Sequence, residues 1–477
     1  MTRVLLINPL SPERLGAPLL GFQQVAAAFL SRDCEVRVID AGARNFTRNP
    51  GAILAEALDF SPEIVGFSLS TRWAGHAYRL AGHFIDRFPL LVAGGPHPTA
   101  RPVEVLRHGF DIAVIGEAEE TISQLVEHVR GRKSREEICG IWFRASGGII
   151  GEGRPPIPPE DLDLIPLPHI AQSLFDPRWY HDSELEALPG GIITSRGCPA
   201  RCTFCANSIL PRSFRYRSPQ SIVEELKILH ARSGATFFPF WDDAFTSNRE
   251  RLFPLLDAFE RQIPFELRWS AITRANMISQ KLLAAMKRAG CIHINFGVES
   301  GDDETLRTVK KGLTTAEVVR ALESANALGL TVTCNFMLGF PHETPEAIER
   351  TLLFMERIAP LVNSFGTLGV VVPFPGTPLY EESHRKYGFT DWWLREEYSR
   401  YLPPPPIEEP ERFYRYYIDD PNLELNFFRY PEGTRQIIRA CLKFKADHNL
   451  RRMGYGRLLH PGRPALFLQG PPQPHLP

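Results

Sequence analysis

The sequence lacks a charge excess, a long apolar run and any internal repeat. Its 54 Lys and Arg residues balance 55 Asp and Glu residues, which leaves a formal net charge of −1 over 477 residues. This balance gives no support for nucleic acid or an anionic membrane as a partner. No stretch approaches the roughly 18 consecutive apolar residues of a membrane-spanning helix, and the first apolar run ends early, at Asn8-Pro9. We therefore expect a cytoplasmic protein without integral membrane association.

Cysteine is scarce, with eight residues, and its distribution separates two kinds of position. Five cysteines lie singly in apolar surroundings, where a reduced core thiol is expected: Cys34, Cys139, Cys291, Cys334 and Cys441. The other three fall within one short stretch, at Cys198, Cys202 and Cys205. In a cytoplasmic chain such a cluster indicates a metal site rather than disulfides.

The first 130 or so residues alternate short apolar runs with helical patterns. The expected strands are Val4–Asn8, Glu35–Ile39, Ile64–Ser70, Leu90–Ala93 and Ile112–Ile115. Continuous apolar strands that alternate with helices predict a parallel sheet covered on both faces. We expect a doubly wound, Rossmann-like domain of five strands, with its ligand crevice at the carboxyl ends of the strands.

A proline-rich stretch, from Arg154 to Pro168, predicts a semi-rigid linker. The strand and helix alternation then resumes, with helix starts predicted at Ser218-Pro219, at the capping box Thr314 to Glu317, and at Thr344-Pro345. Six expected strands indicate a partial (β/α)6, TIM-like barrel: Gly191–Ser195, Phe237–Trp241, Phe265–Ala271, His293–Val298, Thr331–Leu338 and Thr367–Pro373. After Tyr380 the alternation stops, and we expect a small, mostly helical C-terminal region.

The spacing of the clustered cysteines is C-x3-C-x2-C, directly after the first expected barrel strand. Thiolates are soft ligands that suit iron–sulfur clusters. Three of them hold three irons of a [4Fe–4S] cube and leave the fourth iron open to a small molecule. A structural zinc site is disfavoured because it needs a fourth Cys or His, and neither His181 nor His230 has ligand spacing.

This loop, with the aromatic Phe204 before its last cysteine, resembles that of the radical S-adenosylmethionine (radical SAM) superfamily. The resemblance implies that Cys198, Cys202 and Cys205 hold a [4Fe–4S] cluster that binds and cleaves SAM. It also implies SAM contacts near the strand ends, from Phe204, Asp242, Asp243, Arg274 and Glu299. For the Asp pair and Glu299, helix capping in the loops is the alternative reading.

The N-terminal domain resembles the cobalamin-binding domain of B12-dependent radical SAM enzymes, on the stretches GGPHPT from Gly94 and VIGEAEET from Val114. The resemblance implies cobalamin contacts from Ser70, Thr71, Gly94, Gly95, Gly116 and Glu117. The D-x-H-x-x-G motif that supplies a histidine to cobalt is absent after the first strand, and His97 reads as a turn residue rather than a ligand. A domain that has lost its cofactor is the alternative.

We thus expect four parts: a cobalamin-binding domain at 1–147, a linker at 148–188, a radical SAM partial barrel at 189–382, and a substrate or capping region at 383–477. The expected activity is C-methylation of an unactivated carbon in a small-molecule, lipid or natural-product substrate, with a flavodoxin or ferredoxin as electron donor. The alternatives are an oxidative cyclase, a ring-contracting enzyme or a dehydrogenase with the same cofactors. A non-catalytic cobalamin or redox sensor is a third class, disfavoured because no effector module is present.

Three weaker signals have plain readings. Arg212, Arg215 and Arg217 favour a solvated, partly packed loop over an anionic substrate site. The basic positions between Arg435 and Arg452 favour a solvated helix face over RNA binding, because the net charge is neutral. The aromatic region that begins at Asp391-Trp392-Trp393 reads either as core of a cap or as the wall of an apolar pocket.

Overall fold

The computed structural model describes residues 1–9, 18–44, 49–180, 191–210, 213–366, 369–395, 415 and 418–453. The chain divides into two compact units, each built from separate stretches. The first unit comprises Met1–Gly190, Cys205–Tyr216 and Pro373–Pro403, and the second comprises Gly191–Phe204, Arg217–Val372 and Pro404–Pro477. The four parts expected from the sequence stay a prediction. Within the described residues, no helix has the length and apolar content needed to cross a membrane.

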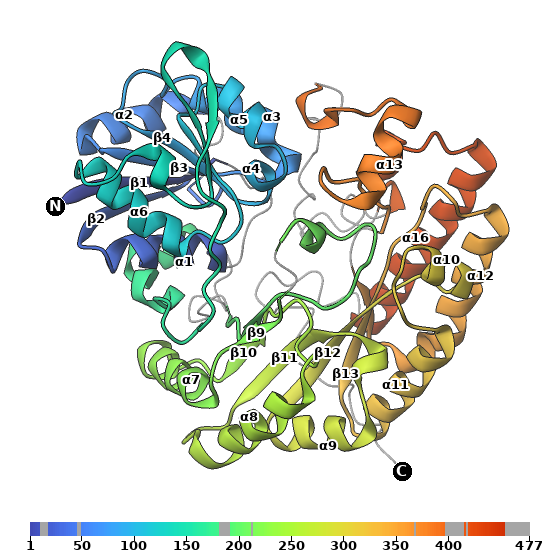
Figure 1. Cartoon of the computed structure of the whole chain (residues 1–477). Helices are drawn as coiled ribbons and strands as arrows, with labels where there is room; N and C mark the ends of the chain where they lie inside the picture. The colour runs from blue at the N-terminus through green and yellow to red at the C-terminus, as the bar shows by residue number, and fades with distance from the viewer. Residues whose placement is uncertain are drawn as a thin grey trace. The chain divides into compact units, whose positions relative to one another are not determined.

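The first unit is built on a seven-stranded sheet in the order β2-β1-β3-β4-β5-β6-β7 (Figure 1). The strands are β1 (Thr2–Asn8), β2 (Cys34–Asp40), β3 (Ile64–Ser68), β4 (Leu91–Gly94), β5 (Ile112–Val114), β6 (Ile141–Arg144) and β7 (Ile150–Glu152). The first five are parallel and confirm the five expected strands. β6 and β7 add an antiparallel hairpin that the sequence reading missed.

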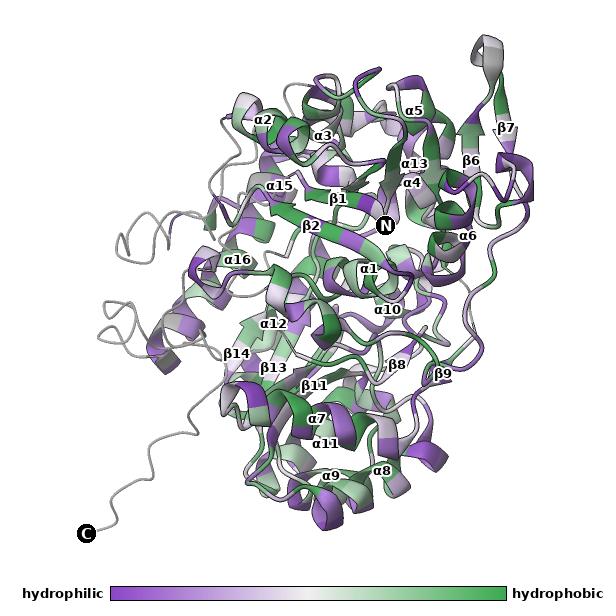
Figure 2. Ribbon diagram, turned by 90° about the vertical axis from the view of Figure 1, so that its left-hand side faces the viewer, coloured by the Kyte–Doolittle hydropathy of each residue, from purple (hydrophilic) through white to green (hydrophobic). Residues whose placement is uncertain are grey.

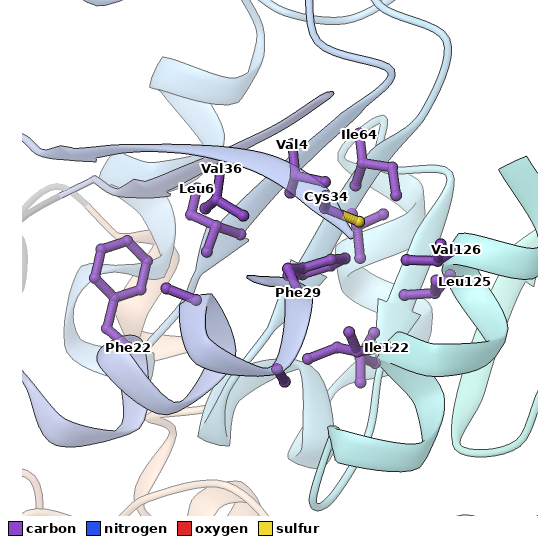
Figure 3. Packing of buried hydrophobic residues seen from close by; sticks show 14 of the residues in the cluster. Val4, Leu6, Phe22, Phe29, Cys34, Val36, Ile64, Ile122, Leu125 and Val126 are labelled. Carbon is purple, nitrogen blue, oxygen red and sulfur yellow. The ribbon is translucent and has the colours of Figure 1, made fainter. Parts of the chain in front are cut away.

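Helices cover both faces of this sheet, as the doubly wound class requires (Figure 1). α1 (Leu20–Leu30) and α6 (Glu119–Val129) pack on one face, where Phe29, Ile122 and Leu125 meet Val4 and other buried strand residues (Figure 3). The remaining helices are α2 (Pro50–Phe60), α3 (Ala74–Ala81), α4 (Pro96–Ala100) and α5 (Pro102–Arg107). The proline-rich stretch is followed by 3-10 turns that bring Phe175 and Tyr180 into the same core.

The second unit contains a five-stranded parallel sheet in the order β10-β11-β12-β13-β14. Its strands are β10 (Phe237–Phe240), β11 (Arg268–Thr273), β12 (Cys291–Glu299), β13 (Thr331–Phe336) and β14 (Ser364–Gly366). Ile192 forms a single parallel bridge to Phe240, and Leu338 forms another to Val370. The partial barrel is therefore confirmed, but its first expected strand is reduced to one bridge and its sixth begins earlier, at Ser364. Residues 367–368 lie outside the described part.

Helices line the outer side of this sheet (Figure 1). They are α7 (Pro219–Ser233), α8 (Arg249–Gln262), α9 (Gln280–Arg288), α10 (Asp303–Thr308), α11 (Thr315–Ala327) and α12 (Pro345–Ile358). The three predicted helix starts are confirmed: the side chains of Ser218, Thr314 and Thr344 accept bonds from backbone N–H groups of the first turn, and Glu317 completes the capping box. Figure 2 shows the apolar strands of the sheets against polar patches on the helices.

Past the barrel strands, the chain contributes to both units. In the first unit lie α13 (Pro378–Tyr387) and the 3-10 turn η9 (Trp392–Leu394), and in the second lie α15 (Pro421–Leu425) and α16 (Glu432–Met453). α16 packs beside α12 and β14, where Phe365 meets Phe444 with ring centroids 5.8 Å apart. Its basic residues agree with the solvated-face reading: Arg435 and Arg439 pair with Glu424 and Glu432. Lys445 is the exception, because it is buried.

Candidate functional site

The six residues expected to contact cobalamin lie in loops at the carboxyl edge of the first sheet. They lie at the end of β4 or follow β3, β4 and β5: Ser70, Thr71, Gly94, Gly95, Gly116 and Glu117. The strand order places the topological switch between β1 and β3, where α/β sheets of this type bind ligands. Gly95 has a φ of +111°, and a Cβ there would lie 2.8 Å from the carbonyl oxygen of Leu69. The loop after β4 thus needs glycine for its backbone path.

His97 is buried below this edge and is fully engaged in a side-chain network. Its Nε2 lies 2.9 Å from Tyr78 Oη and 3.1 Å from Glu104 Oε1, and its Nδ1 lies 3.2 Å from Thr71 Oγ1. Trp393 Nε1 donates to the same Glu104 oxygen at 2.8 Å. Both ring nitrogens of His97 are therefore used, which agrees with the turn-residue reading and leaves no imidazole nitrogen for cobalt. Thr71 is drawn into the same network.

The C-terminal tryptophans are core residues of the first unit. Trp392 is 1% exposed and Trp393 is 2% exposed. Trp392 Nε1 donates to the carbonyl oxygen of Pro373 at 2.9 Å. Of the two readings of this aromatic region, the described part supports packed core. The stretches 401–406 and 412–414 lie outside the described residues.

The two described arginines that follow the cysteine loop, Arg215 and Arg217, form ion pairs. Arg215 pairs with Glu117 inside the first unit, and its Nη1 also donates to the carbonyl oxygen of Pro159 at 2.6 Å. Arg217 pairs with Glu225 inside the second unit, with both side chains at most 4% exposed. These pairs agree with a packed loop rather than an anionic substrate site. Arg212 lies outside the described residues.

The cysteine loop carries half-buried Cys198, buried Cys202 and half-buried Cys205. Arg274, just after β11, places Nη1 3.5 Å from Cys202 Sγ. Burial raises the pKa of the Cys198 thiol, while the charges of Arg274 and Asp243 act on it in opposite directions. These four side chains of the second unit, Cys198, Cys202, Asp243 and Arg274, therefore share one neighbourhood. Cys205 belongs to the stretch that is counted with the first unit.

The cysteines do not form a closed metal cage by themselves. Across the described ranges, no group of three or more His, Cys, Asp or Glu side chains is gathered as a metal ion requires. Arg274 nevertheless has a buried Nε with no hydrogen-bond partner among the described residues. A buried, unpartnered guanidinium N–H is costly unless an anionic group meets it. The Arg274 guanidinium is thus placed to pair with a cluster thiolate and with a carboxylate. The cluster ligands themselves stay a prediction.

Asp242 differs from its neighbour Asp243, because it is fully buried and turned toward the protein. Its Oδ1 accepts from Thr194 Oγ1 at 2.7 Å and from Ser195 Oγ, and its Oδ2 accepts from Thr194 N at 3.2 Å. Arg251 lies 3.6 Å from the carboxylate and donates to Thr194 O at 2.8 Å. The Asp242 carboxylate therefore holds Thr194 and Ser195 in place through bonds to both side chains and to the Thr194 backbone. These two residues lead directly to the cysteine loop.

Glu299 ends β12 in the left-handed region, with a φ of +77°. Its Oε1 accepts from Lys311 Nζ at 2.8 Å, and both side chains are at most 10% exposed. Lys311 Nζ also lies 6.0 Å from the ring centroid of Phe204, which packs against Phe340 at 5.4 Å. Non-glycine residues rarely hold such a φ outside functional or over-determined positions. Lys311 was missed by sequence reasoning, because no motif surrounds it.

Comparisons with known proteins match a family to each of the two sheet-containing parts of the chain. Residues 192–355 match the radical SAM superfamily, and residues 16–126 match the B12 binding domain. The chain is 31% identical over 371 residues to an uncharacterized methyltransferase of Pyrococcus horikoshii, covering 76% of this chain and 78% of that protein. The chain belongs to the cobalamin-dependent radical SAM enzymes. The resemblance and the fold class expected from the sequence are confirmed.

Two further relatives extend this comparison. The chain is 26% identical to the anaerobic magnesium-protoporphyrin IX monomethyl ester cyclase of Cereibacter sphaeroides, over 74% of this chain and 59% of that protein. It therefore spans less than two thirds of the cyclase. A similar fold is found in the radical S-adenosylmethionine methyltransferase TsrM from Kitasatospora setae, solved with cobalamin and a [4Fe-4S] cluster bound, with a TM-score of 0.66 at 20% identity over 81% of this chain and 76% of that one. The cofactors of the family are the [4Fe–4S] cluster, SAM and cobalamin.

Proposed function

We propose that this enzyme is a cobalamin-dependent radical SAM C-methyltransferase that acts on an unactivated carbon of a small molecule. The observation that carries the proposal is the pairing, in one chain, of a cysteine loop beside the buried Arg274 with a doubly wound B12 domain. The methyltransferase of Pyrococcus horikoshii, similar over most of both chains, supports methyl transfer as the reaction.

Cys198, Cys202 and Cys205 of the cysteine loop would hold the cluster, which supplies reductive cleavage of SAM to a carbon radical when bound. Arg274 would meet the carboxylate of SAM through its unpartnered Nε. Burial beside the apolar core strengthens this charge pairing and keeps water away from the radical. Phe204 would form an apolar side of the site next to the cysteines.

The other expected SAM residues take different parts in the proposal. Lys311 would add a second cation, and its ion pair holds the Glu299 carboxylate in place for polar groups of SAM. Asp243 is exposed, and it lies close enough to Cys198 for its charge to raise the pKa of that thiol. We therefore retain Asp243 as a proposed contact of SAM. Asp242 has its carboxylate fully used by Thr194 and Ser195. We assign Asp242 to anchoring the loop rather than to SAM.

In the first unit, the loops after β3, β4 and β5 would hold cobalamin, which supplies the methyl carrier when bound. Ser70 is exposed and can reach a ligand, and Gly94, Gly95 and Gly116 let the backbone approach a bulky tail closely. Thr71 and Glu117 contribute indirectly, through His97 and Arg215. Since His97 has both nitrogens engaged, cobalt would have no imidazole ligand from this residue.

Methyl transfer can be tested without knowing the substrate. The holoenzyme, reduced anaerobically and given SAM, should release S-adenosylhomocysteine in step with methylation of its cobalamin, followed by the change in the visible spectrum. The cobalamin-free protein is the control and should release none. Reductive cleavage of SAM to 5′-deoxyadenosine without any S-adenosylhomocysteine would contradict the proposal.

The cyclase relative supports one alternative, an oxidative cyclase with the same cofactors. A ring-contracting enzyme or a dehydrogenase would give the same product pattern, 5′-deoxyadenosine without S-adenosylhomocysteine. The experiment above therefore separates methyl transfer from all three. We further propose a cytoplasmic location and a flavodoxin or ferredoxin as the electron donor, since the cluster needs a low-potential one-electron reductant.

A further inference from the structure

The sheet of the second unit has an apolar outer face and an inner face that is polar along β12, β13 and β14. Side chains alternate between the faces along each strand. Phe240 and Trp269 meet Phe259 of α8, and Phe336 meets Phe354 of α12, so these positions face the helices. The opposite face carries the apolar residues Phe237, Pro239 and Ile272 on β10 and β11, with Ile272 beside Asn295. Its polar and small residues, which we call the inner polar face, are Ser270, Asn295, Gly297, Thr333, Asn335, Ser364 and Gly366.

Two amides form the centre of this face. Asn335 Nδ2 donates to Asn295 Oδ1 at 2.5 Å, from neighbouring strands β13 and β12. Both side chains are half-buried, so the pair is accessible in part. Thr333 and Ser364 lie beside it and bond to each other at 2.6 Å.

The amide pair leaves one whole NH2 group and one whole carbonyl oxygen for a ligand. Each asparagine side chain has an NH2 group and a carbonyl oxygen, and the bond between them uses one of each. Within the described part of the chain, nothing bonds to the remaining NH2 of Asn295 or to the remaining oxygen of Asn335. Exchanging the two ends of both amides gives the same result, one NH2 and one carbonyl. One free NH2 group and one free carbonyl oxygen therefore face a ligand whichever way the two amides are oriented.

Glycines keep room beside these amides. A Cβ on Gly366 would lie 2.0 Å from Asn335 Oδ1, so any larger residue would displace the amide. A Cβ on Gly297 would lie 2.8 Å from Glu299 Oε1 and 3.0 Å from Lys311 Nζ. This places the charged ends of the Glu299–Lys311 pair on the same face, over Gly297, which lies about 7 Å along the strand from Asn295. The amide pair and the proposed SAM residues thus share one surface of one unit.

We propose that Asn295 and Asn335 bind a substrate that carries an N–H and a C=O side by side, as in a lactam or a carboxamide. The complementary edge of such a group accepts from the NH2 of one asparagine and donates to the oxygen of the other. A hydrocarbon on this face would bury both groups unpaired, at a cost that discriminates strongly against it. The inference rests on the proposed function, and it replaces a lipid hydrocarbon with a polar compound as the substrate class.

Direct binding of a fragment tests this inference. The oxidised holoenzyme is mixed with 2-pyridone, a flat ring with adjacent N–H and C=O, and saturation transfer from protein to ligand is measured by NMR. We expect binding to 2-pyridone and roughly fivefold to tenfold weaker binding to 1-methyl-2-pyridone, which has lost its N–H donor. Asn335→Leu and Asn295→Leu should each weaken 2-pyridone binding by a similar factor. Gly366→Ala should do the same by displacing the Asn335 amide.

Asn326→Leu, the same change on the outer helix α11, is the matched control and should bind 2-pyridone like the wild type. Absence of 2-pyridone binding to the wild type would overturn the inference. Equal binding by the wild type and the inner-face variants, or equal loss in the Asn326 control, would overturn it too. The three inner-face variants guard against one of them failing to fold. The readout needs no SAM turnover, so its failure is distinct from a failure to release S-adenosylhomocysteine.

Discussion

Replacing Asp242 with asparagine removes one charge of a buried ion pair and leaves Arg251 uncompensated. The Asp242 carboxylate is 3.6 Å from Arg251, and the two side chains are 0% and 3% exposed. Removing one partner of such a pair costs about 3 kcal/mol or more. For a structural unit of this size, that corresponds to a fall in Tm of about 6 to 12 °C. Because Asp242 holds Thr194 and Ser195, iron per chain should fall as well.

Thermal and guanidinium unfolding of the full chain measure the loss of stability, iron analysis measures the loss of cluster, and SAM titration measures the affinity for SAM. The double variant Asp242→Asn with Arg251→Met removes both charges and should be more stable, by at least about 1 kcal/mol, than the sum of the single changes. SAM affinity, counted per loaded cluster, should not change. A fall in SAM affinity with stability and iron content intact would refute this reasoning and make Asp242 the SAM contact that sequence reasoning expected.

Three further predictions concern other parts of the chain. Burial raises the pKa of Glu343 from 4.5 to about 7, so the folded chain retains a proton that the unfolded chain has lost. Glu343 therefore lowers the free energy of unfolding as the pH rises from about 4.5 to about 7. In Glu343→Gln, this pH-dependent loss of stability should be smaller by about 1 to 2 kcal/mol, measured by urea unfolding at several pH values. Trp393→Ala should cost about 3 to 5 kcal/mol in the same assay; a loss under about 1 kcal/mol would contradict its place in the core. Replacing Cys198, Cys202 and Cys205 together with alanine should abolish iron binding and SAM cleavage, and retained cleavage would exclude them as the cluster ligands.

The strands were predictable wherever burial on both faces makes the sequence continuously apolar. β1 and β3 are examples. The hairpin β6–β7 was missed because Trp142 and Arg144 alternate with buried residues in a short antiparallel pair at the sheet edge. The first barrel strand was overestimated: it joins β10 only through the bridge at Ile192, and the side chains of Thr194 and Ser195 bond to Asp242.

The candidate site was predictable at its motif and less so around it. The cysteine spacing marks the cluster loop, but adjacent residues at a strand end point in opposite directions, so the sequence did not separate buried Asp242 from exposed Asp243. Lys311 reaches Glu299 only through the turn after α10, a long-range contact that no local pattern encodes. The inner polar face likewise depends on strand register, which pairs Gly297 with Asn335.

The most direct test of the account is the metal content of the full chain, purified anaerobically from a host supplied with cobalamin. Iron and cobalt are measured on the same sample and divided by protein concentration. We expect roughly four irons and about one cobalt per chain. Iron without cobalt would contradict the proposed function, because the first unit would then be a scaffold and methyl transfer through cobalamin would be untenable.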